Sequence, residues 1–121
     1  MNTVQNRWFS LYRIAQVWAK RRSGWEVDLV TDASEDGLVA SPVELRWNGM
    51  GRIEFWVYEN GGISVLFFAD EDSDDFRELG VRTDPLAAFK LGAGKLIAME
   101  LETFSNFVES PDCGFYMAEG A

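Results

Sequence analysis

The sequence contains no histidine among its 121 residues. Histidine is the usual general base near neutral pH, it activates serine and cysteine nucleophiles, and it is the commonest side-chain ligand of transition metals. Without it, catalysis would have to come from carboxylates, lysine or tyrosine. We therefore expect a protein that is not an enzyme and that holds no metal and no cofactor.

Cysteine and long apolar runs are also scarce. Cys113 is the only cysteine, which excludes an internal disulfide or a cysteine-rich zinc site and fits a reducing compartment. The longest apolar run, Val65 to Ala69, is far shorter than the roughly twenty residues that cross a bilayer. Arg7 and Arg13 interrupt the N-terminal apolar region, which argues against a signal peptide. We expect a cytoplasmic protein.

Proline is rare, with three residues, whereas 47% of the chain is hydrophobic and 14% is aromatic. This composition is typical of a packed globular protein and not of a disordered one. A chain of this length is close to the commonest size of one domain. The sequence therefore predicts that residues 1–121 form a single compact domain.

The net charge of −9 is distributed unevenly along the chain. Residues 1–25 contain five basic residues and no acidic one, whereas residues 26–121 contain twenty acidic and six basic residues. An acidic body repels nucleic acid and anionic membranes and attracts basic protein surfaces. We expect the partner to be a protein with a basic surface, with no direct contact to nucleic acid or membrane, and the chain to be a monomer or a homodimer.

Residues 2–24 show the spacing of an amphipathic helix. Apolar side chains recur every three or four residues, basic residues gather near the end, and Gly24 follows as a stop. Phe9 and Val17 fall on the side of this helix that carries basic residues. Either a C-terminal element covers these two side chains or they contact a partner.

Beyond Gly24 the apolar period changes to two residues, which predicts strands. A first strand over residues 25–29 is followed by a turn-rich connection and by strands near residues 43–47, 52–58 and 63–69. Short glycine-containing loops join the last three strands. The pattern predicts a four-stranded antiparallel meander.

The alternation also predicts the register of this meander. If the apolar residues share one face, Trp47 lies opposite Ile53 and the loop between them is centred on residues 49–51. The same logic makes residues 59–61 the next loop, and both loops then end on a glycine, the residue preferred at a left-handed position.

The other face of the meander, which we call the second face, mixes charged and apolar side chains. Its large apolar side chains would each gain about 1.5–3 kcal/mol by leaving water, so we expect C-terminal helices to cover them. Two of its carboxylates, Glu44 and Glu54, resemble an enzyme's acid pair, but a cross-strand ion pair between Arg46 and Glu54 explains them in the predicted register. The second face consists of Glu44, Arg46, Arg52, Glu54, Trp56, Tyr58, Leu66 and Phe68.

Three helices are predicted after the meander. Residues 73–80 carry a serine cap and a glycine stop, and residues 84–92 carry an aspartate cap, a proline in the first turn and a terminal glycine. Residues 94–110 have an apolar stripe at helical spacing, although residues 95–102 alone would also fit a strand. Residues 111–121 indicate a turn and a tail.

An acidic run follows the last predicted strand. Asp70, Asp72 and Asp74 alternate as in a calcium-binding loop, but Asp75 stands where that loop requires glycine and Val81 where it requires glutamate. Part of the run fits the first turn of the predicted helix over residues 73–80, where carboxylates are favoured. The remaining three acids, Asp70, Glu71 and Asp72, form either a solvated loop or a partner contact.

These features favour a small acidic inhibitor that binds a protein and has no catalytic role. Examples are a phage anti-defence protein, such as an anti-CRISPR or anti-restriction protein, and an immunity protein against a toxin nuclease. Binding sites commonly combine buried aromatic residues with a charged rim, and acidic surfaces speed association with basic targets. The predicted partner-binding residues are Asp70, Glu71, Asp72, Trp56, Tyr58, Leu66, Phe68, Glu44 and Glu54.

Two other functions fit the same sequence. One is an acidic cytoplasmic chaperone or adaptor that acts as a dimer through the second face or the first helix. The other is an α+β domain that binds a small molecule in an aromatic pocket.

Overall fold

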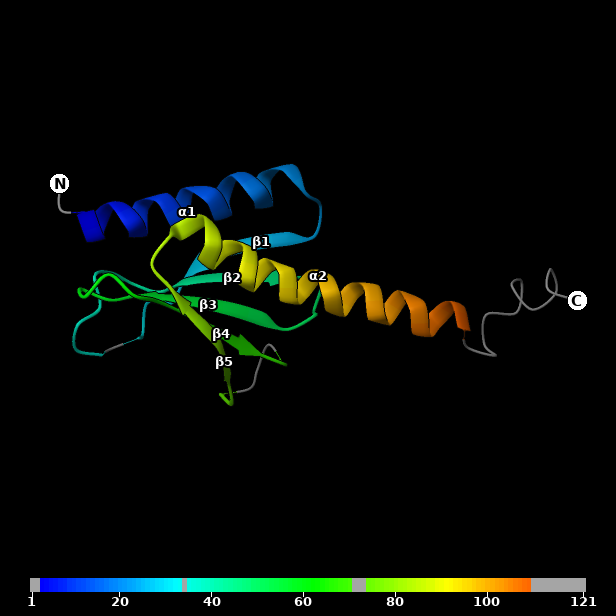
Figure 1. Ribbon diagram of the computed structural model, residues 1–121. Coiled ribbons are helices and arrows are strands. Elements are labelled where there is room, and N and C mark those ends of the chain that lie inside the picture. The colour runs from blue at the N-terminus through cyan, green and yellow to red at the C-terminus, as the bar shows by residue number, and fades with distance from the viewer. Residues whose placement is uncertain (1–2, 34, 71–73, 110–121) are drawn as a thin grey trace, which may run out of the picture.

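The computed structural model describes residues 3–33, 35–70 and 74–109. It is an α+β protein with an N-terminal helix, an antiparallel sheet and a C-terminal helix, which confirms the predicted class (Figure 1). The predicted number of strands and of C-terminal helices is wrong, because the described residues form five strands and one C-terminal helix. The elements are α1 (Thr3–Arg21), β1 (Trp25–Leu29), β2 (Val43–Trp47), β3 (Arg52–Val57), β4 (Ile63–Phe68), β5 (Arg77–Arg82) and α2 (Pro85–Glu109).

The sheet has the strand order β1-β2-β3-β4-β5, and all neighbours are antiparallel. Strand β5 begins in the second half of the segment, residues 73–80, for which the sequence predicts a short helix. Pairing with β4 gives both segments a ladder of backbone hydrogen bonds, with a bulge between Val65 and Leu66. The tertiary pairing overrides the local helix signals, because without β5 the outer edge of β4 would be left with unpaired backbone groups.

The first hairpin differs from the predicted register by two residues. Leu45, and not Trp47, lies opposite Ile53. The turn begins earlier than predicted, because Asn48 and Gly49 both adopt positive φ angles and the amide of Met50 donates to the carbonyl of Trp47 at 2.8 Å. A shift of two residues leaves every side chain on its predicted face.

The second hairpin has the predicted register. Arg52 lies opposite Phe68, and the amide of Tyr58 donates to the carbonyl of Gly62 at 2.9 Å across the loop of residues 59–61. Gly61 ends that loop with a φ of 92°, the left-handed conformation for which glycine was expected.

Helix α2 begins as predicted and ends much later. The Asp84 carboxylate caps it by accepting from the amide of Ala87 at 3.0 Å. Gly92 lies inside the helix and not at its end. A larger residue would not fit there, because a Cβ would lie 2.7 Å from side-chain atoms of both Ile53 and Phe55. The glycine is therefore a close-packing position against β3, and residues 95–102 are helical.

Both helices cover the same face of the sheet (Figure 1). Trp8, Leu11 and Ala15 of α1 and Ala88, Phe89 and Leu96 of α2 are buried against it. The side chains that the central strands point toward the helices are fully buried: Val43, Leu45, Ile53, Phe55, Val57, Ile63 and Val65. The predicted amphipathic character of the first helix is confirmed. Of its two misplaced apolar residues, Val17 is half-buried near α2, whereas Phe9 remains 53% exposed.

Candidate functional site

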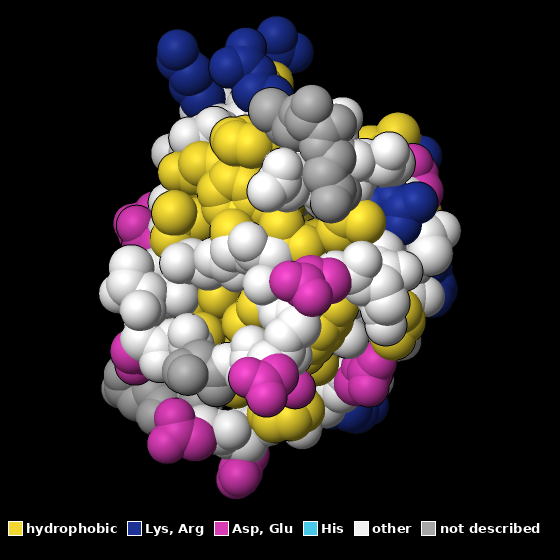
Figure 2. All heavy atoms as spheres, turned by 90° about the vertical axis from the view of Figure 1, so that its left-hand side faces the viewer, with side chains coloured by type: hydrophobic (Ala, Val, Ile, Leu, Met, Phe, Trp, Pro, Cys, Tyr) yellow, Lys and Arg dark blue, Asp and Glu magenta, His cyan; other side chains and the backbone are white. Residues whose placement is uncertain are grey.

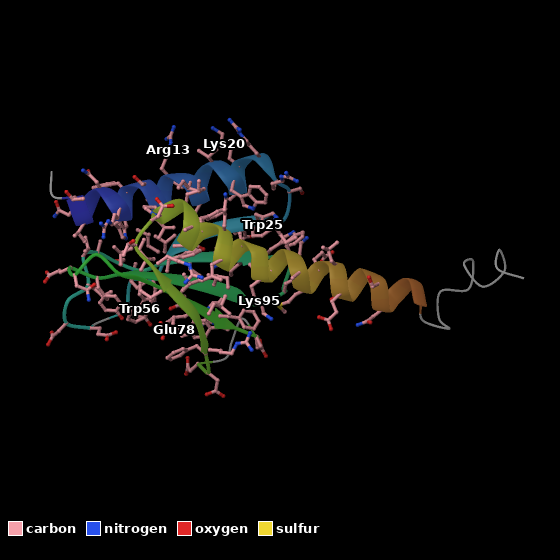
Figure 3. All side chains as sticks on the ribbon, in the orientation of Figure 1. Arg13, Lys20, Trp25, Trp56, Glu78 and Lys95 are labelled. Atoms are coloured by element: carbon pink, nitrogen blue, oxygen red, sulfur yellow. The ribbon has the colours of Figure 1, made fainter. Side chains whose placement is uncertain are left out.

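Neither helix of the described part of the chain covers the second face, so the prediction that C-terminal helices cover it is wrong. Both helices lie on the other side of the sheet, and Trp56 and Glu78 lie on the side away from α2 (Figure 3). A hollow with a volume of about 640 Å³ lies over the second face. Its walls are the β1–β2 connection and residues 74–78, which lie at opposite edges of that face.

Glu54 lies in the floor of the hollow and is only 5% exposed. Its carboxylate accepts from Arg52 Nε at 3.1 Å and from Trp56 Nε1 at 2.9 Å. The guanidinium of Arg52 also stacks on the ring of Phe68, 3.8 Å from its centroid. A buried carboxylate requires such compensation, since an unpaired charge in this position would be costly.

The lining of the hollow is strongly acidic and partly aromatic. Six carboxylates and one guanidinium reach it. Carboxylates and aromatic ring faces both attract cations, the first by charge and hydrogen bonding and the second by the ring quadrupole. The arrangement is therefore suited to a guanidinium or ammonium group. The charged lining residues are Asp32, Glu35, Glu44, Arg52, Glu54, Asp74 and Glu78, and the aromatic ones are Trp56, Tyr58, Phe68 and Phe76.

Tyr58 ties one wall to the sheet. Its hydroxyl donates to the Glu35 carboxylate at 3.1 Å, and Leu38 forms a β-bridge with the Tyr58 backbone. Burial raises the pKa of the Tyr58 phenol above its usual value, and the hydrogen bond to Glu35 and the negative charges of Glu35 and Glu78 raise that pKa further. The β1–β2 connection is thus held beside the floor by both backbone and side-chain contacts.

Arg46 does not pair with Glu54, contrary to the predicted ion pair. In the observed register Glu44 lies opposite Glu54. Arg46 instead binds Glu44, together with two acids of β1, Glu26 at 2.8 Å and Asp28 at 2.5 Å. These hydrogen bonds raise the pKa of Arg46, with the bond to Glu26 as the largest cause. This cluster compensates Glu44 at the margin of the hollow.

Six of the nine predicted partner-binding residues line the hollow: Glu44, Glu54, Trp56, Tyr58, Leu66 and Phe68. Asp70 is exposed beside it, and its carbonyl oxygen accepts from Arg52 at 3.3 Å. Glu71 and Asp72 lie outside the described residues.

Sequence reasoning missed the walls of the hollow, namely Asp32, Glu35, Asp74, Phe76 and Glu78. The acids of the turn-rich segment after β1 were a signal that could have been used, because a connection that long can fold back over the sheet. The acids after residue 73 were assigned to a helix, so their position in a wall was not foreseen.

Comparison of this chain with protein-family models, with curated proteins and with solved structures finds no match. Within residues 3–33, 35–70 and 74–109, no helix is long and apolar enough to cross a membrane. The same residues contain no group of three or more acidic, cysteine or histidine side chains placed to hold a metal ion.

Proposed function

We propose that the protein is a non-enzymatic inhibitor that binds a basic, nucleic-acid-handling protein through the hollow of the second face. The observation that carries the proposal is the charge of the lining, with six carboxylates against one guanidinium around aromatic walls. A surface that binds nucleic acid is rich in arginine and lysine. Spaced carboxylates satisfy these groups as phosphates do, so the inhibitor competes with nucleic acid for the same surface.

The uncompensated acids define where a partner's cation binds. Glu44 and Glu54 are already neutralised by Arg46 and Arg52. In contrast, Asp32, Asp74 and Glu78 form no ion pair with any described residue. These three acids stand in the walls, so a partner's arginine would enter between them and stack on the aromatic floor. The paired acids hold the floor in shape, and the unpaired ones supply the attraction.

The rest of the molecule supports rapid association with such a partner. Residues 26–121 carry twenty acidic and six basic residues, so the field over the sheet side is negative. Figure 2 shows Asp and Glu side chains mainly over the lower part of the molecule and a group of Lys and Arg side chains at the top, over α1. A basic partner is thereby steered toward the second face.

The experiment compares two variants with equal charge changes. Asp74→Asn with Glu78→Gln neutralises the walls of the hollow, whereas Asp36→Asn with Glu59→Gln neutralises two exposed acids outside it. Each protein is used to capture partners from the host lysate, and any protein captured by the wild type is purified and tested for inhibition of its nucleic-acid binding. We expect the wall variant to bind that partner about tenfold more weakly, with a flatter salt dependence, and the control variant to bind it like the wild type. Equal inhibition by the wall variant would contradict the proposal.

The volume of the hollow favours one second candidate, a domain that binds a small organic cation. Small-molecule sites typically measure about 300–1,000 Å³, and the hollow of about 640 Å³ lies in this range. Native mass spectrometry of the protein purified from its host distinguishes the two functions. A retained small molecule that is lost in the wall variant favours the second candidate, and a bare chain favours the first.

A further inference from the structure

A second surface, far from the hollow, lies between the two helices. The groove there has a volume of about 560 Å³ and lies between the C-terminal half of α1 and the first turns of α2. Its rim is basic, and Figure 3 shows that Arg13, one of the rim residues, points away from the sheet. The floor consists of Ile14, Val17, Trp18, Leu86 and Phe89, and the rim consists of Arg13, Arg21, Arg22 and Lys90.

The far end of α2 has the opposite character. It extends beyond the sheet and beyond the end of α1 (Figure 1). Residues 100–109 contain three glutamates and no basic residue. Leu101, within this projecting segment, is 62% exposed although it is a large apolar residue. An acidic helix with an exposed leucine is complementary in charge and in polarity to a basic groove with an apolar floor.

Gly94 lies between the groove and the projecting segment and has no role in the described fold. Glycine is less favourable than alanine within a helix, so its presence there calls for a reason. At Gly92 the reason is the contact with Ile53 and Phe55, but a Cβ at Gly94 would meet nothing within 4 Å. Gly94 is exposed. Glycine in this position suits the close approach of another backbone to α2.

These features lie along one side of α2. Leu86, Lys90, Gly94 and Leu101 are separated by four, four and seven residues, so they follow one stripe of the helix. Gly94 is eight residues from Leu86 and seven residues from Leu101, or about 10–12 Å of helix in either direction. If two α2 helices cross antiparallel with Gly94 of each at the crossing point, Leu101 of each copy therefore lies over the groove of the other.

We propose that a second copy of this chain occupies the groove. In this dimer the two α2 helices are related by a two-fold axis at Gly94, and the projecting segment of each copy binds between α1 and α2 of the other. The interface is closed, because each copy uses its groove and its projecting segment once. The proposal goes beyond the inhibitor function and does not depend on it. The hollows lie on the opposite side of each sheet, so both remain open.

Sedimentation equilibrium over a range of protein concentrations tests the dimer with two matched variants. Leu101→Glu and Phe76→Glu each place a charge at a large apolar residue of similar exposure, 62% and 59%, on opposite sides of the sheet. We expect the wild type to dimerise, Leu101→Glu to raise the dimer dissociation constant at least about tenfold, and Phe76→Glu to leave it unchanged. A wild-type monomer at the highest soluble concentration would overturn the proposal, as would equal dimerisation by Leu101→Glu. The Phe76→Glu variant controls for a general effect of added charge.

A third variant, Gly94→Ala, separates dimerisation from folding. The added methyl group favours the helix, so the thermal midpoint of the dilute protein rises, while the crowded crossing point weakens the dimer about tenfold. A general loss of fold would instead lower the thermal midpoint as well as weaken the dimer.

The register of the dimer is tested by cross-linking in a Cys113→Ser background, so that each variant has a single cysteine. Gly94→Cys places the two thiols at the crossing point, whereas Thr103→Cys places them about 27 Å apart along the helix pair. Because a side chain at position 94 weakens the dimer, oxidation is carried out at a protein concentration well above the dissociation constant of Gly94→Ala. We expect oxidation to cross-link the first variant and not the second. Cross-linking of Thr103→Cys alone, or of both variants equally, would overturn this arrangement.

Discussion

The two faces of the same sheet are built on opposite principles. Toward the helices, side chains such as Leu45, Ile53 and Phe55 are fully buried and entirely apolar. Toward the hollow, the same strands place Glu44, Arg52 and Glu54 among aromatic rings. Successive residues alternate between the faces, so a single strand such as β3 serves a dry core on one side and a charged hollow on the other.

The difference shows what charge requires in a partly buried place. On the helix face none of the fully buried side chains is charged, and stability comes from apolar area removed from water and from close packing. On the second face the buried acid Glu54 is held by two donors, and its positive partner is itself stacked on a ring. The buried charge of the second face is therefore compensated by its neighbours, whereas the exposed acids of the walls, Asp32, Asp74 and Glu78, need no such compensation.

Truncating one phenylalanine on each face gives the largest expected contrast. Phe55→Ala removes a fully buried ring from the helix face, and we expect the free energy of unfolding to fall by about 3–5 kcal/mol. Phe76→Ala removes a ring that is 59% exposed at the wall of the hollow, and the fall should be below about 1 kcal/mol. Urea denaturation followed by tryptophan fluorescence measures both values. Similar losses at the two positions would show that the second face is covered in solution.

Removing a charge from the second face gives an intermediate effect. Glu54→Leu leaves Arg52, whose side chain is 12% exposed, without its carboxylate, and we expect a loss of about 3 kcal/mol. Arg46→Met breaks two exposed ion pairs, with Glu26 and Asp28, and a third with Glu44, whose side chain is 17% exposed. We therefore expect a smaller loss than for Glu54→Leu, of about 1–2 kcal/mol.

Glu54→Gln is the control for this pair, because it keeps an acceptor for Trp56 and removes only the charge. Its loss of unfolding free energy, measured by urea denaturation, should lie between those of Glu54→Leu and Arg46→Met. If Arg46→Met were the more damaging change, the exposed cluster and not Glu54 would organise the second face.

The faces of the sheet could be predicted from the sequence because they depend only on a period of two residues. A register error of two residues, as at Trp47, changes which residues are neighbours but not the face to which they point. The start of α2 was also predictable, since the Asp84 cap and Pro85 are local signals. Local signals failed where a distant contact decided the outcome. Gly92 fits against Ile53 and Phe55, and the segment after Ser73 pairs with β4.

The candidate site was predictable in its floor and not in its walls. Floor residues such as Trp56 and Phe68 belong to the strands, so their face follows from the alternation. Wall residues such as Glu35 and Glu78 reach the hollow through a folded-back connection and an unpredicted strand. The ion pairs were mispredicted for the same reason, since the partners of Arg46 depend on the exact register and on β1.

The smallest expected effect concerns the wall tyrosine and its pH dependence. Burial, and then the bond to Glu35, raise the pKa of Tyr58 above its ordinary value of 10.0, so the folded state holds the phenolic proton more tightly than the unfolded state. The stabilisation from this proton is complete below pH 10 and is lost as the pH rises through the pKa of the folded protein. Urea midpoints at about pH 8 and about pH 11 should therefore differ less in Tyr58→Phe than in the wild type. Tyr12→Phe, on the helix side of the sheet, controls for the other groups that titrate in this range. If Tyr58→Phe and the wild type lost stability equally at high pH, Tyr58 would not be buried by its wall, and the second face would be more open than the hollow described above.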